Sequence, residues 1–250
     1  MNLFFFLTGS ILASFICCQI DRLNNNIPLL RRHSFCESCR HPLSWGDLIP
    51  IAGYLLNRGR CRYCHKPIRP VLPLFETLGG LAFVLLYQYY GLSLLLLKYL
   101  ILTILLLALS YEDFISLHIH DSLLILILLN RLLFYDGYPL LDRLLFNSLL
   151  VPVLLLVFAG VFYLIKHIKP IGSGDICLMA VLSSYFDWDH NLLILLMACT
   201  IGLVFGLLSR KKGLLQPFPF VPSISLAAFI SLFCASKIIH WYLFSFCHFF

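Results

Sequence analysis

Long apolar stretches alternate with short polar connections along this chain. A helix needs roughly 20 mainly apolar residues to cross a bilayer, and the sequence contains eight such runs, the sixth of them short. The runs are Leu3–Ile20, Leu72–Tyr90, Leu92–Ser110, Phe114–Leu133, Leu144–Ile165, Ile176–Trp188, Leu192–Ser209 and Ile224–Cys247. Strands of a membrane barrel would be shorter and would alternate in polarity. The pattern therefore predicts an all-α polytopic membrane protein with about eight transmembrane helices.

Composition excludes a soluble protein. Of the 250 residues, 60% are hydrophobic and 12% are charged, whereas soluble domains are about 45–50% apolar and about 25% charged. Even a soluble domain of about 300 residues buries only about 75% of its surface. A soluble enzyme and a disordered protein are both excluded.

Residues 21–71 form the one long polar segment. This loop carries nine of the 18 lysine and arginine residues, and the positive-inside rule places such a loop in the cytoplasm. With this loop in the cytoplasm, eight membrane crossings place both the N-terminus and the C-terminus on the non-cytoplasmic side of the membrane. The net charge of +6 is thus explained by topology and by contact with membrane lipid, and it implies no nucleic-acid partner.

Four cysteines in this loop form two CxxC motifs. They are Cys36 with Cys39, and Cys61 with Cys64, with the motifs about twenty residues apart. This spacing is typical of a structural zinc site with four thiolate ligands. A reducing cytoplasm argues against two disulfides. The alternative is a loop whose thiols bind no metal.

Two aspartates lie at the predicted cytoplasmic face. Asp113 ends the segment Ser110–Asp113, and Asp175 ends Gly172-Ser173-Gly174-Asp175. Two adjacent carboxylates cannot both ionise at low cost, so one keeps a proton and the pair provides a base and an acid. Glu76, one turn into the second span, is a further candidate. Taken alone, these acids also fit interfacial ion pairs or a proton-coupled transporter.

The motifs together resemble the prepilin leader peptidases, which are GxGD membrane aspartic proteases. Six motifs occur in the order that is found in this family. They are the opening Gly9–Phe15 with Asp21-Arg22-Leu23, the two cysteine motifs, Pro73 with Glu76, Asp113 with Ile119 and Asp121, Gly172–Asp175, and Phe218–Pro222. Val221 stands where the family has glycine.

The resemblance implies a bacterial inner-membrane enzyme that removes leader peptides from type IV prepilins or pseudopilins. Asp113 and Asp175 would be catalytic, with Gly172 and Gly174 supporting the motif. Residues 1–110, with loop 21–71, would form a methyltransferase region that uses S-adenosylmethionine and Glu76, and residues 111–250 the peptidase core. The alternatives are a proton-coupled transporter and a non-enzymatic zinc-loop scaffold of a secretion system.

Overall fold

The computed structural model describes residues 1–28, 33–134, 148–167, 171–208 and 218–247. Within these ranges the regular structure is helical, with two isolated β-bridges. The chain divides into two compact units, Met1–Glu112 and Asp113–Phe250, and each unit is described by itself.

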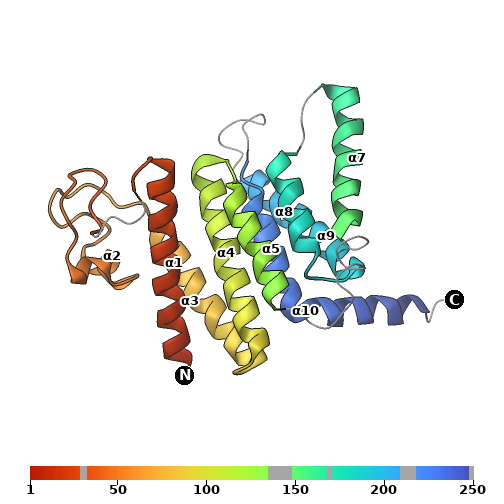
Figure 1. Cartoon of the computed structure of the whole chain (residues 1–250), viewed down its shortest axis with the longest axis horizontal. Coiled ribbons are helices and arrows are strands. Elements are labelled where there is room, and N and C mark those ends of the chain that lie inside the picture. Colours follow the sequence, from red (N-terminus) through yellow and green to blue (C-terminus); the bar gives the residue numbers. More distant parts are fainter. Residues whose placement is uncertain (29–32, 135–147, 168–170, 209–217, 248–250) are drawn as a thin grey trace. The chain divides into compact units, whose positions relative to one another are not determined.

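The first unit is built on two helices that lie side by side, α1 (Asn2–Asn24) and α3 (Val71–Tyr90) (Figure 1). Small residues allow their close approach: a Cβ atom on Gly79 would lie only 2.7 Å from the Cβ of Ala13. Close packing of small residues is the usual way in which helices associate in lipid, where no hydrophobic force draws them together. Most of α4 (Leu94–Ser116) also belongs to this unit.

The loop between α1 and α3 contains two short helices, η1 (Trp45–Leu48) and α2 (Ala52–Leu56). The second unit contains the end of α4 and five further helices in the described residues. These are α5 (Asp121–Leu133), α7 (Ser148–Lys166), α8 (Ser173–Ser183), α9 (Trp188–Leu208) and α10 (Val221–Cys247).

Each of the eight predicted membrane spans corresponds to a helix in the described residues. Six helices, α1, α3, α4, α7, α9 and α10, are long and apolar enough to cross a membrane. The other two predicted spans correspond to α5, with 13 residues, and α8, with 11 residues. At about 1.5 Å per residue these are shorter than the roughly 30 Å hydrocarbon core. Residues 144–147 and Ser209, at the ends of two predicted spans, lie outside the described residues.

The predicted start of the fourth span, Phe114, is wrong. Residues 114–116 continue α4, and the helix ends where Leu117 adopts a positive φ of 53° and donates its N–H to the carbonyl of Asp113. A residue in the left-handed region is a common helix terminator. Asp113 therefore lies within the last turn of a helix, and α5 starts only at Asp121.

Buried polar side chains terminate the short helix α8. Arg131 is 1% exposed and donates from Nε to the Ser184 carbonyl at 2.9 Å, while Asn191 donates from Nδ2 to the Ser183 carbonyl at 3.0 Å. The last carbonyls of any helix lack partners within it, and a cation near this end is favourable for the helix dipole. Because its C-terminal end is capped in this way, α8 can end among apolar neighbours.

Candidate functional site

Asp113 is held at the start of another helix. Its side chain is 6% exposed, and its Oδ2 accepts the N–H of Val221 at 3.0 Å. Val221 is the first residue of α10. Free N–H groups and the positive end of the helix dipole both favour a carboxylate at such a position. The segment Phe218–Pro222 therefore positions Asp113.

Asp175 is also bound at a helix N-terminus, here that of its own helix. It is the third residue of α8, and its Oδ2 accepts the N–H of Gly172 at 3.3 Å. Its side chain is partly exposed. Asp175 lies close enough to Asp113 for the two negative charges to repel each other. The structure thus brings the two predicted aspartates into one site within the second unit.

Gly174 allows the segment after Asp113 to pack against α8. A Cβ atom at this position would lie 2.7 Å from Cδ1 of Ile119 and 3.3 Å from its Cβ, so any side chain here would force Ile119 to shift. Ile119 belongs to the connection between α4 and α5. The glycine therefore allows Ile119, which follows the helix of Asp113, to pack closely against the first turn of α8.

If the two aspartates form an active site, Gly174→Ala should lower its activity about tenfold, because the new methyl group moves Ile119 and α8 apart, and small displacements of reacting groups are costly. The double variant Gly174→Ala/Ile119→Ala makes room for the methyl group and should recover most of the activity. Initial rates of the single and double variants measure the effect. No recovery in the double variant would show that Ile119 is not the obstacle.

The sequence did not reveal what holds Asp113 or what ends α8. The donor for Asp113 is a backbone N–H, which has no side-chain signature. Pro222 directly after Val221 was the available signal, because proline favours the first turn of a helix. The structure places Arg131 in the interior with Asn130 and Tyr185, whose side chains hydrogen-bond to each other at 3.0 Å.

The four loop cysteines form a cluster in the first unit. All four sulfurs lie within 4.8 Å of one another, and the sulfurs of Cys36 and Cys64 are 3.9 Å apart. Tetrahedral zinc with Zn–S bonds of about 2.3 Å separates its ligands by about 3.8 Å. The predicted set is therefore brought together with a geometry that fits a metal ion.

The two cysteine motifs adopt the same turn. In the first, Cys36 receives the N–H of Arg40 and donates its own N–H to His41; in the second, Cys61 does the same with His65 and Lys66. Arg40 and His65 both have positive φ, at 60° and 57°. Repetition of one turn around a common centre is what a four-thiolate site requires.

The thiols of the cluster resist joint ionisation. Although burial opposes it, backbone hydrogen bonds from Cys39 and Ser38 lower the pKa of Cys36 to about 7. The Lys66 backbone N–H lowers the pKa of Cys64, but desolvation and the three neighbouring thiols outweigh it and raise the value to about 11. A bound cation would relieve this repulsion, since only thiolates ligate metal.

Zinc bound by this cluster should be displaced by acid. Each thiol must be deprotonated to bind zinc, so lowering the pH from 8 to 6 strengthens the competition by protons for the four ligands, and the apparent affinity should fall more than about a hundredfold. Chelator competition with elemental analysis of the full-length protein measures this. Cys36→Ser and Cys61→Ser should remove the metal, whereas Cys177→Ser, an exposed cysteine outside the cluster, should retain it. Stoichiometric zinc in Cys36→Ser would contradict the assignment.

Glu76 lies between the helices and the loop. Its side chain is 9% exposed; its Oε2 accepts the N–H of Ile51 at 2.7 Å, and Ser14 of α1 also hydrogen-bonds to it. Ile51 has a positive φ of 63°, an unusual conformation for a β-branched residue. Glu76 therefore holds a strained backbone segment of the loop against α1 and α3.

A second polar cluster joins the first cysteine motif to the helices. Arg69 pairs with both Asp21 of α1, at 2.7 Å, and Glu37 of the motif. Tyr111 of α4 donates to Asp21 at 3.0 Å. The loop is thereby tied to the C-terminal end of α1.

Comparison with known proteins identifies two family models along the chain. Residues 7–90 match the bacterial peptidase A24 N-terminal domain, and residues 100–207 match the type IV leader peptidase family. No solved structure matches the chain.

Curated relatives cover most of the chain. A protein of Aeromonas salmonicida is 30% identical over 228 residues, which are 89% of this chain and 77% of the relative. One of Klebsiella pneumoniae is 34% identical over 194 residues, 74% of this chain and 85% of the relative. One of Neisseria gonorrhoeae is 29% identical over 230 residues, which are 89% of this chain and 79% of the relative. All three are named prepilin leader peptidase/N-methyltransferase. By the extent of these matches and the two family models, the chain belongs to the type IV leader peptidase family.

Proposed function

We propose that this protein cleaves leader peptides from type IV prepilins or pseudopilins with Asp113 and Asp175 as the catalytic pair. The observation that supports this most strongly is the placement of the two carboxylates. One is bound at the N-terminus of α10 and the other at the N-terminus of α8, close enough to repel. Membership of the family favours this function over a transporter or a scaffold.

In this mechanism the pair shares one proton. The ionised aspartate removes a proton from water, whose oxygen attacks the scissile carbonyl carbon. The protonated aspartate then donates its proton to the amide nitrogen as the carbon–nitrogen bond breaks. The leader leaves with a new carboxylate, the pilin keeps a free N-terminal amine, and no covalent intermediate forms. The bond must be cleaved in an extended strand, and we infer that this strand binds near the N-terminus of the short helix α8.

We further propose that residues 1–110 N-methylate the new amine with S-adenosylmethionine, and that residues 111–250 form the peptidase. The match of residues 7–90 to the family's N-terminal domain and the names of the relatives support this division. Glu76 would act here by holding the loop in place. Zinc bound by Cys36, Cys39, Cys61 and Cys64 would maintain the shape of the loop without taking part in chemistry.

The proposed location is the bacterial cytoplasmic membrane. Nine basic residues in loop 21–71 support a cytoplasmic loop. The catalytic aspartates would face the same compartment, which holds the basic leader of a prepilin.

Mass spectrometry of a co-expressed prepilin-like substrate tests both activities. Cleavage by the wild-type protein, with the added mass of one methyl group on the mature N-terminus, is the expected result. A cleaved but unmethylated product would reject the methyltransferase alone. An uncleaved substrate in the presence of well-expressed protein would reject the peptidase.

A further inference from the structure

The loop of the first unit exposes large apolar side chains. Trp45 is 91% exposed, Leu56 77% and Leu55 66%, and Leu48 and Ile49 are exposed as well. We call these five residues the α2 hydrophobic surface. An apolar cluster of this kind on a loop that faced only water would be unusual and indicates an interaction.

Hydrogen bonds and close packing hold together the loop segment that carries this surface. Asp47 of η1 accepts hydrogen bonds from the backbone and hydroxyl of Ser44 and, through its other oxygen, from Asn57 beyond α2 at 3.1 Å. Gly53 of α2 packs so closely on η1 that a Cβ atom would lie 2.6 Å from the Asp47 carbonyl oxygen. η1 and α2 therefore present their apolar side chains as one folded element.

Hydrogen bonds place this element beside the membrane-spanning helices. The N–H of Ile51, which directly precedes α2, binds Glu76, and Glu76 is also bonded to Ser14. Ser14 precedes Asp21 by seven residues on α1, which is about 10 Å along the helix axis. Asp21 and its partner Arg69 mark where the apolar parts of α1 and α3 end. Figure 1 accordingly shows α2 alongside α1 and below its C-terminal end.

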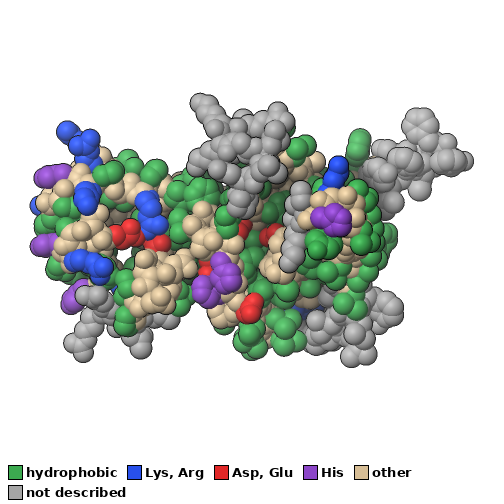
Figure 2. Space-filling view, turned by 90° about the horizontal axis from the view of Figure 1, so that it is seen from above, with side chains coloured by type: hydrophobic (Ala, Val, Ile, Leu, Met, Phe, Trp, Pro, Cys, Tyr) green, Lys and Arg blue, Asp and Glu red, His purple; other side chains and the backbone are tan. Residues whose placement is uncertain are grey.

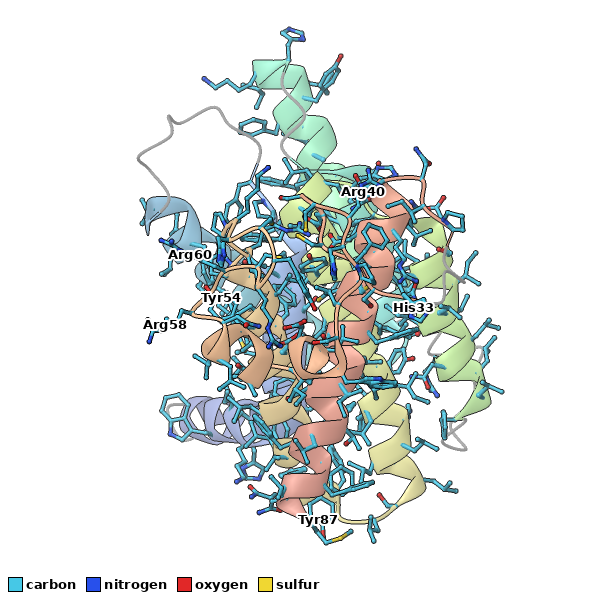
Figure 3. The ribbon with its side chains drawn as sticks, turned by 90° about the vertical axis from the view of Figure 1, so that its left-hand side faces the viewer. His33, Arg40, Tyr54, Arg58, Arg60 and Tyr87 are labelled. Carbon is cyan, nitrogen blue, oxygen red and sulfur yellow. The ribbon has the colours of Figure 1, made fainter. Side chains whose placement is uncertain are left out.

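Basic side chains accompany the surface. Arg58 and Arg60 follow α2 directly, and Figure 3 shows them with Tyr54 on one side of the loop, away from His33. Seen from above, lysine, arginine and histidine side chains gather over the loop end of the first unit (Figure 2). Exposed apolar side chains with basic ones close by in the chain match the chemistry of a membrane surface, where acyl chains lie next to phosphates.

We propose that the α2 hydrophobic surface inserts into the membrane beside α1 and α3, so that lipid acyl chains cover it and anionic headgroups bind Arg58 and Arg60. The cysteine loop is then an interfacial element of the membrane domain. Its lipid contact is continuous with the lipid-facing sides of the two helices.

The depth of Trp45 tests this directly, because the chain has only three tryptophans. In full-length protein with Trp188→Phe and Trp241→Phe, Trp45 is the sole tryptophan. The protein is reconstituted in vesicles of phosphatidylcholine with phosphatidylglycerol that carry a nitroxide either at a shallow acyl position or on the headgroup. Quenching by the shallow acyl nitroxide should exceed quenching by the headgroup nitroxide at least twofold, and aqueous iodide should have little effect.

A matched reference is Asn24→Trp in a background that also carries Trp45→Phe. Asn24 is the last, exposed residue of α1, so its tryptophan should respond more to the headgroup nitroxide and to iodide. Strong iodide quenching of Trp45 without acyl quenching would overturn the proposal. Relief of acyl quenching by an excess of a prepilin-like apolar peptide would also overturn it, because the substrate helix would then be the occupant.

A separate pair of substitutions tests whether Arg58 and Arg60 bind anionic headgroups. Arg58→Gln/Arg60→Gln should abolish any increase in acyl quenching that phosphatidylglycerol causes over pure phosphatidylcholine. An unchanged dependence on phosphatidylglycerol would reject these two arginines as the headgroup ligands. None of these readouts depends on peptidase activity.

Discussion

Asp113→Asn and Asp175→Asn should each reduce leader cleavage at least about a thousandfold, since each removes either the base or the acid and such proton transfers contribute roughly 10²–10⁴-fold apiece. Asparagine keeps the size and hydrogen-bond acceptor of the side chain, so Asp113→Asn still accepts the N–H of Val221. Loss of activity would therefore report on chemistry and not on folding. Cleavage of a prepilin-like substrate by purified variants in detergent or vesicles measures the rates.

The matched control is Asp187→Asn. Asp187 directly precedes α9 at an exposed position, and its carbonyl accepts the N–H of Asn191. Asparagine serves as well as aspartate at a helix N-cap, so this variant should cleave at the wild-type rate. Substantial cleavage by either Asp113→Asn or Asp175→Asn would refute the catalytic pair.

Val221→Pro should lower cleavage roughly ten- to a hundredfold. Proline has no N–H, and a hydrogen bond to a charged group is worth about 1.5–3 kcal/mol. Proline is favoured at the first position of a helix, which is where Val221 lies in α10. The substitution thus removes the donor to Asp113 with little expected change in the helix. The fall should appear in kcat, with KM for the prepilin nearly unchanged.

Two further variants distinguish the contribution of the Val221 backbone N–H from that of its side chain. Val221→Ala and Val221→Gly keep the backbone donor, and the second restores the glycine of the family motif. Both should retain activity within a few-fold of wild type. If Val221→Ala were as impaired as Val221→Pro, the side chain and not the hydrogen bond would matter.

Local sequence features predicted the helices because a chain in lipid can adopt few kinds of secondary structure. A long apolar segment in a membrane must satisfy its backbone internally, so continuous runs such as those of α1 and α9 become helices. The cysteine cluster was equally predictable, since spacing alone determines how two tight turns direct four sulfurs to one centre. The aspartates were found by their motifs.

The contacts that position these groups could not be predicted from local sequence. Arg131 caps a carbonyl 53 residues away, and Asp113 binds an N–H that lies 108 residues later. In both cases the partner is a backbone group, the carbonyl of Ser184 or the N–H of Val221, and backbone groups carry no sequence signal. The end of α4 at Leu117 was missed because leucine rarely adopts positive φ, so nothing in Ser116–His118 indicates a stop.

The binding of Asp113 to the start of α10 has a consequence for biosynthesis. The ribosome completes Asp113 long before Val221, so a nascent chain carries this aspartate without the N–H that orients it. If Asp113 is catalytic as proposed, full cleavage activity is therefore acquired only after α10 has been synthesised. Under the proposed mechanism, products of translation that stop before Val221 would cleave at least about tenfold more slowly, and the membrane would hold little active protease before assembly is complete.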